Sequence, residues 1–105
     1  TESAAERCRS VLNYQPDNAV ALYYLAQFHR EQGDLDLAEI SYLQLLRAWP
    51  HFGHGHLQFG RCLLEMGKEQ EARTAYLHAE RQGLVEASEW RAGLVEEDAE
   101  GQKGQ

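Results

Sequence analysis

The sequence is poor in proline and cysteine and contains no long apolar run. Its 105 residues include only two prolines, so the residue that most strongly interrupts helices is rare. No apolar segment approaches the roughly 20 residues that a bilayer-spanning helix needs, so we do not expect membrane insertion. Two cysteines without a CxxC pair supply neither a disulfide framework nor a cysteine-based metal motif. We expect Cys8 and Cys62 to be small buried side chains in a reducing compartment, which favours a cytoplasmic protein.

Basic residues are also scarce. Ten lysines and arginines stand against seventeen aspartates and glutamates, which gives a net charge of −7. An acidic surface repels phosphate backbones, so nucleic acid is not expected as a partner. The chain also lacks a glycine-rich phosphate loop, a GxSxG elbow and an HExxH helix. Its serines on predicted helices have no base at triad spacing, so we predict neither an enzymatic activity nor a cofactor.

Three histidines form an H-x-x-H-x-H cluster at His51, His54 and His56. A zinc or nickel site needs imidazoles that converge on one ion, commonly together with further ligands. No cysteine is close in the sequence, and residues two apart on a helix point in different directions. We therefore predict loop and packing histidines here, and no metal site.

What the sequence does contain is a repeat. Pro16 and Pro50 are 34 residues apart. The same offset relates further identical residues, which are the pairs Gly33–Gly67, Ala38–Ala72, Tyr42–Tyr76, Leu43–Leu77 and Arg47–Arg81. A fixed period of this length indicates a helical repeat protein.

Each repeat is predicted to be a pair of helices. Apolar residues recur at helical spacing on both sides of Gly33 and Gly67, which are suited to separate two helices. Asn18 and Asp34 precede such runs and are suited to cap helix N-termini. The chain then divides into the second helix of a truncated first repeat, two full repeats, a capping helix and a flexible tail, which are 1–18, 19–52, 53–86, 87–97 and 98–105.

This pattern resembles the tetratricopeptide repeat family, whose signature combines W-x2-L-G-x2-Y with A-x3-F, A and P. The most specific match is the segment 33–38 (GDLDLA), continued by Tyr42 and Pro50, and Trp90 stands where the next tryptophan is expected. The resemblance implies an all-α fold, a right-handed α-solenoid of antiparallel helix pairs. It would hold about three pairs, including the incomplete terminal units.

The small residues of the pattern are expected to allow close helix packing. Ala26 and Gly60 allow two helix backbones to approach closely, and Tyr42 and Tyr76 are expected to fill the space beside them. One helix pair cannot bury its apolar face alone, so the pairs must stack. We expect Trp90 on the last helix to cover the second full repeat.

The resemblance also implies a concave groove, lined by the first helix of each pair, that binds a peptide. Eight residues are expected there, which are Tyr23, Gln27, Arg30, Leu57, Gln58, Arg61, Leu64 and Arg91. Each of these helices contributes one arginine, and arginine binds carboxylates through two parallel hydrogen bonds. We hypothesise a ligand with an acidic residue or a free C-terminal carboxylate beside an apolar side chain. The alternative is that the arginines are solvated and only cover apolar surface with their stems.

Three functions remain open. The first is an interaction scaffold or adaptor that binds a peptide or protein segment in the groove. The second is a structural or regulatory segment of a larger enzyme or assembly, which self-associates through its opening helix at Cys8, Val11 and Leu12. The third is a chaperone for a secreted substrate, because some bacterial secretion chaperones resemble such short stacks of repeats.

Overall fold

The computed structural model describes the backbone of residues 4–103 and the side chains of residues 4–94. This part of the chain forms six helices and no strand. The helices are α1 (Ala4–Tyr14), α2 (Ala19–Glu31), α3 (Leu35–Ala48), α4 (Gly53–Glu65), α5 (Glu69–Arg81) and α6 (Val85–Lys103). The predicted all-α architecture is confirmed. None of the six combines the length and hydropathy that a membrane span requires.

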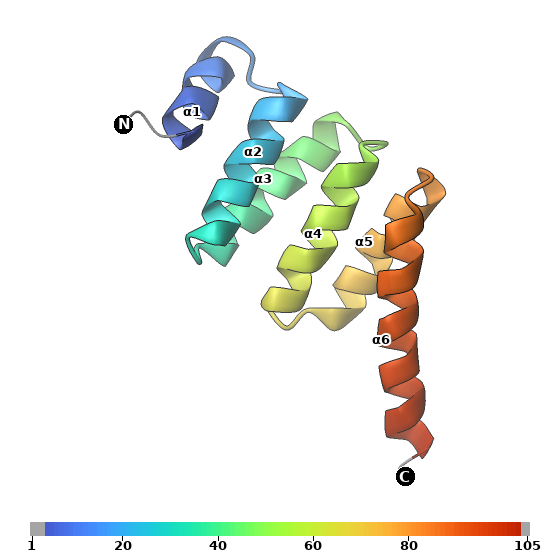
Figure 1. Ribbon diagram of the computed structural model, residues 1–105. Coiled ribbons are helices and arrows are strands. Elements are labelled where there is room, and N and C mark those ends of the chain that lie inside the picture. The colour runs from blue at the N-terminus through green and yellow to red at the C-terminus, as the bar shows by residue number, and fades with distance from the viewer. Residues whose placement is uncertain (1–3, 104–105) are drawn as a thin grey trace.

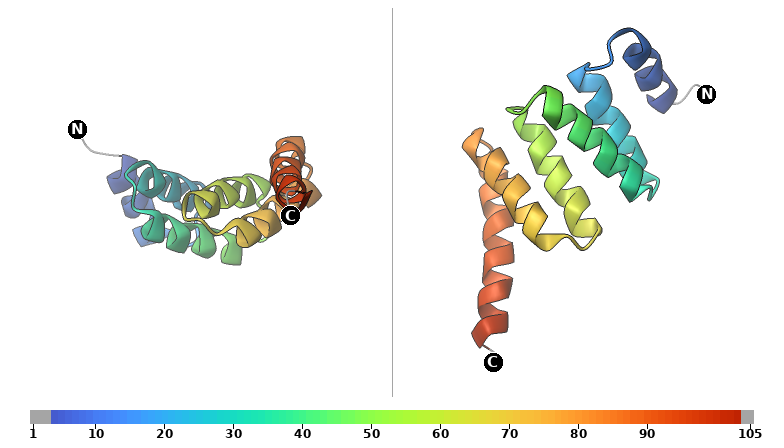
Figure 2. Two further views of the ribbon diagram at one scale, coloured as in Figure 1. Left: turned by 90° about the horizontal axis from the view of Figure 1, so that it is seen from below. Right: turned by 180° about the vertical axis from the view of Figure 1, so that it is seen from behind.

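Consecutive helices run antiparallel and stack side by side along the molecule (Figure 1). Viewed along the helices, α2 and α4 form one layer and α3 and α5 form the other (Figure 2, left). The stack measures 53 × 27 × 19 Å. It is an α-solenoid of helix pairs, in which α2, α4 and α6 border the concave side.

The predicted turn residues lie at the helix ends. Gly33 and Gly67 follow α2 and α4 with φ angles of +82° and +81°, a conformation that glycine adopts without strain. Asn18 caps α2, because its side-chain oxygen accepts a hydrogen bond from the Ala21 N–H at 2.9 Å. Asp34 also precedes its helix, but its side chain makes no capping bond. That predicted cap was therefore wrong.

The small residues allow the close packing that the repeat predicted. Ala26 and Gly60 are buried, and a Cβ atom at Gly60 would lie only 2.5 Å from Cε1 of Tyr76. Tyr42 and Tyr76 are fully buried beside them, and the Tyr42 ring packs on Phe59 with centroids 5.8 Å apart. Each tyrosine thus fills the space that a small residue on the neighbouring helix leaves free.

The last helix is longer than predicted. We expected it to end near residue 97 and to be followed by a flexible tail, but α6 continues to Lys103. Trp90 packs edge-on against Tyr76 with centroids 5.6 Å apart, and Leu94 is buried in the same cluster. The first half of α6 therefore covers the apolar face of the second full repeat, as expected for a capping helix.

Candidate functional site

Three polar side chains of α2 were predicted to line the concave groove, and two of them contact each other. Tyr23 and Gln27 are half-buried, and the Gln27 amide donates a hydrogen bond to the Tyr23 hydroxyl at 3.4 Å. Tyr23 and Gln27 are one helical turn apart. Arg30 follows on the same side of α2. These three residues are the part of the predicted groove that α2 would contribute.

Arg30 is buried to an unusual degree for an arginine, since only 11% of its side chain is exposed. Its Nε lies 4.0 Å from a carboxylate oxygen of Glu65, which is an ion pair but too long for a hydrogen bond. The buried Nη1 atom has no hydrogen-bond partner among the described residues. The buried side-chain oxygen of Gln58 on α4 lacks a partner in the same way. Arg30 and Gln58 thus hold a buried donor and a buried acceptor without a partner among the described residues.

A cavity of about 380 Å³ opens farther along the groove, between α4 and α6. It is lined by Arg61, Leu64, Glu65, Tyr76 and Trp90. The Arg61 guanidinium carbon lies 5.2 Å from the centroid of the Trp90 ring, within the range of a cation–π interaction. Arg61 is exposed, so its charge is available to solvent and to a ligand while its stem covers the aromatic surface.

Two of the eight predicted groove residues are placed differently. Leu57 is only 2% exposed and belongs to the core around Tyr76, so it cannot contact a ligand. Arg91 pairs with Glu80 of α5, with Nε on one carboxylate oxygen and Nη2 on the other at 3.1 Å. Its guanidinium is engaged by the protein itself, so the predicted row of three arginines is reduced to Arg30 and Arg61.

These two arginines act on the same aromatic residues. Burial raises the pKa of Tyr76 to about 12, and Arg61 and Arg30 act in the opposite direction. Burial is also the main cause of the raised pKa of Tyr23, and the same two arginines lower that pKa. Both hydroxyls therefore stay protonated at neutral pH, and both sit in the positive field of one arginine pair.

Glu65 belongs to the site although no sequence pattern had singled it out. It comes four residues after Arg61 on α4, so the two side chains lie on one face of the helix. This i, i+4 spacing was the available signal. Its pairing with Arg30 depends on how α2 packs against α4, which no local pattern shows.

The histidine cluster divides on folding. His51 and His54 are exposed, whereas His56 is buried and its Nε2–H donates to the Pro50 carbonyl at 2.7 Å. The nearest imidazole to His56 comes from α5, where the His78 ring lies 5.0 Å away. Among the described residues, no group of three or more His, Cys, Asp or Glu side chains is arranged to hold a metal ion.

The sequence matches one known protein family. The family model described as anaphase-promoting complex, cyclosome, subunit 3 matches residues 1–79, which extend from α1 almost to the end of α5. No curated protein matches the chain. The matching family consists of tetratricopeptide-type repeats, which are generally non-catalytic modules for protein–protein interaction. The chain therefore belongs to the anaphase-promoting complex, cyclosome, subunit 3 family of tetratricopeptide-type interaction repeats.

Proposed function

We propose that the concave face binds an extended segment of a partner protein through a carboxylate, which Arg30 and Arg61 contact. The observation that carries this proposal is the buried Nη1 of Arg30, which has no hydrogen-bond partner among the described residues. A buried donor without an acceptor costs about 1–3 kcal/mol, and more when it is charged. The Nη1 atom is itself inaccessible, so a ligand carboxylate supplies the missing acceptor by taking the place of the half-exposed Glu65 carboxylate beside the planar guanidinium.

The surroundings of Arg30 support a peptide as the ligand. The side-chain oxygen of Gln58 is buried without a partner, so it can accept a hydrogen bond from a peptide N–H once the side chain turns toward the groove. The cavity beside Arg61 is lined by Leu64, Tyr76 and Trp90, so it suits an apolar side chain next to the carboxylate. Donor, acceptor and apolar cavity together correspond to the three chemical parts of a C-terminal or acidic peptide.

Glu65 is the competitor in this site. Its half-exposed carboxylate lies near Arg30 without a hydrogen bond to Nε, so a ligand carboxylate displaces a weak pair. We expect Glu65→Gln to strengthen binding of an acidic peptide, because it removes both the competition and the like charge.

The proposal is tested with a synthetic array of C-terminal and internal acidic peptides, measured against the protein, the Glu65→Gln variant and two double variants. Arg30→Gln combined with Arg61→Gln should abolish binding of the selected peptides, and amidation of their carboxylates should have the same effect. Arg47→Gln combined with Arg81→Gln changes two exposed arginines on α3 and α5 and serves as the matched control. Circular dichroism verifies that each variant is folded. Equal binding by both double variants would contradict a groove site and favour arginines that only cover apolar surface.

A second candidate, self-association, has one observation in its favour. Val11, Val20 and Tyr24 are exposed and line a cavity of about 290 Å³ where α1 meets α2, with Cys8 at its base. Such an apolar end face can pair with a second copy. Sedimentation across a range of concentrations tests it, since Val20→Glu should abolish any dimer, and a wild-type monomer at high concentration contradicts it. The secretion-chaperone alternative has no comparable observation of its own.

A further inference from the structure

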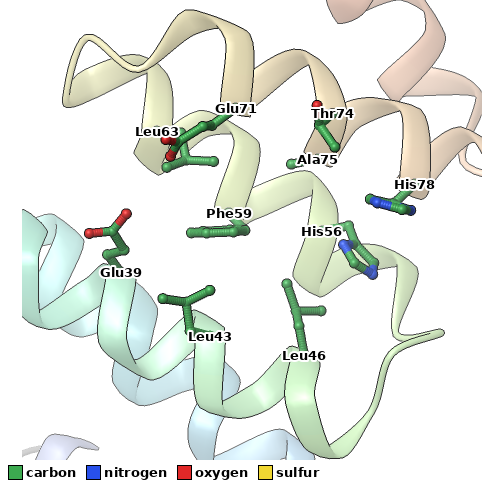
Figure 3. Close-up of a pocket in the computed structure, with 10 residues that line it drawn as sticks. All are labelled: Glu39, Leu43, Leu46, His56, Phe59, Leu63, Glu71, Thr74, Ala75 and His78. Atoms are coloured by element: carbon green, nitrogen blue, oxygen red, sulfur yellow. The ribbon is translucent and has the colours of Figure 1, made fainter.

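Another cavity lies on the opposite side of the molecule from the arginine pair. It has a volume of about 440 Å³ and runs between α3 and α5 with α4 as its floor (Figure 3). Phe59 lies in the middle of it, with Leu43 and Leu46 of α3 on one side and Ala75 of α5 on the other. We call this cavity the outer trough.

The outer trough is apolar and open. Leu43 is 46% exposed, and Leu46 and Phe59 are only partly buried. Leaving three large apolar side chains in contact with solvent along one channel costs hydrophobic free energy that a partner could recover. Leu63 extends the apolar floor beyond Phe59.

The residues that line the two walls of the trough recur at helical spacing. Glu39, Leu43 and Leu46 follow one another at i, i+4 and i+7 on α3. Glu71, Ala75 and His78 do the same on α5. Since α3 and α5 run in the same direction (Figure 1), the two acidic residues share one end and the walls extend for roughly 10 Å, about two helical turns.

The two ends differ in charge. At the acidic end, Lys68 Nζ lies 2.9 Å from Glu39, so one ammonium group stands beside the two carboxylates of Glu39 and Glu71. Lys68 also interacts electrostatically with Glu71, so two carboxylates share one ammonium group and this end keeps an excess negative charge. At the other end lie His56 and His78, and burial lowers the pKa of His56 below its ordinary value.

We propose that the outer trough is a docking site for an amphipathic helix of a partner protein. Two or three aliphatic side chains of that helix, at i, i+3 or i+4 and i+7, fill the trough over Phe59, and a lysine or arginine one turn beyond them pairs with Glu71. A straight channel between two parallel helices fits a third helix, which is recognised by such anchor spacing. The acidic end selects a basic residue and sets the direction of the bound helix.

The test uses a phage-displayed library of helical peptides that is randomised on one face and selected on the intact protein. Selected peptides should share aliphatic residues at the stated spacing and a basic residue at one end. Fluorescence anisotropy with a selected peptide then measures affinity. Leu43→Glu should weaken binding about tenfold or more, and Glu71→Lys should weaken it roughly fivefold.

The controls are matched in exposure and charge. Leu37→Glu alters an equally exposed leucine of α3 that does not line the trough, and Glu31→Lys reverses an exposed carboxylate on α2. Both should leave affinity unchanged, as should Arg30→Gln combined with Arg61→Gln, because the concave groove is a separate site. Selection of no peptide, of peptides without a basic residue, or of peptides that bind the Leu43→Glu variant with wild-type affinity overturns the proposal.

Discussion

Single atoms decide the packing at the contact between Gly60 and Tyr76. A Cβ at Gly60 would lie 2.5 Å from Cε1 and 2.7 Å from Cδ1 of the Tyr76 ring. The ring is 1% exposed and packs against Trp90, so it has little room to move away. The glycine is therefore required by its neighbour and not by its backbone conformation.

We expect Gly60→Ala to lower the free energy of unfolding by about 1–3 kcal/mol, the usual cost of overpacking a rigid core. Urea denaturation followed by circular dichroism measures it. Gly93→Ala is the control, because a Cβ at that helical position of α6 meets no atom within 4 Å. It should be neutral or stabilise by up to about 1 kcal/mol through helix propensity. Equal effects of the two substitutions on the free energy of unfolding would show that the Tyr76 ring moves to make room for the added methyl group.

At the same scale, the protonation of His56 affects the stability of the fold. Burial lowers its pKa, and the nearby His78 and His51 act in the same direction, against the hydrogen bond to the Pro50 carbonyl. Burial likewise lowers the pKa of His29. In both cases the unfolded chain binds a proton at a higher pH than the folded one.

The stability these histidines contribute is therefore present above their unfolded pKa of about 6.5 and is lost as pH falls through and below that value. We expect the free energy of unfolding to decrease between pH 7.5 and pH 5, measured by denaturation at fixed ionic strength. His56→Gln keeps a donor for the Pro50 carbonyl and should flatten the decrease. A wild-type stability that is constant over this range would refute the assignment.

At the scale of the element, α6 covers the core around Tyr76 with Ala87, Trp90 and Leu94, of which Trp90 is the largest. Trp90 contacts the Tyr76 ring and lies under the Arg61 guanidinium. The other tryptophan, Trp49, follows α3, is half-exposed and donates its indole N–H to the Asp17 carbonyl at 2.6 Å. Trp90 thus makes a packing contact between helices, whereas Trp49 makes a hydrogen bond between loops.

We expect Trp90→Ala to destabilise the protein by roughly 2–4 kcal/mol, because it uncovers the core around Tyr76. Trp49→Ala should cost only about 1 kcal/mol, mainly for the lost hydrogen bond. Thermal denaturation of both variants provides the comparison. A larger loss for Trp49→Ala would mean that the loop contact contributes more to the stability of the stack than the α6 cap does.

At the scale of the whole molecule, the stack is elongated. Its radius of gyration is 15.1 Å, whereas a compact domain of this length would have roughly 13 Å. Each helix packs mainly on its neighbours in sequence, and the terminal helices α1 and α6 have such a neighbour on one side only. Stability is then a sum of contacts between adjacent units.

Hydrogen exchange should therefore be fastest in α1 and in the second half of α6, and slowest in α4, which packs on both α3 and α5. Exchange measured by mass spectrometry on peptic fragments resolves these helices. Equal protection of α1 and α4 would indicate one cooperative unit instead of a stack.

The sequence by itself determined the helices and their stacking. A 34-residue offset, breaking glycines and helical spacing are local properties, and they predicted the helix pairs, the burial of Tyr42 and the cap at Trp90. Local signals failed at two helix ends. Asp34 stands at a helix start without capping it, and α6 continues through its glycines and acidic residues.

Only the tertiary structure decided which surface residues are free to bind. Helical spacing places Leu57 and Arg91 on the groove face, but packing buries the first in the core and Glu80 of α5 engages the second. The pairing of Arg30 with Glu65 and the outer trough over Phe59 join residues of different helices. Their positions follow from the distance and angle between packed helices, which the period of a single helix does not contain.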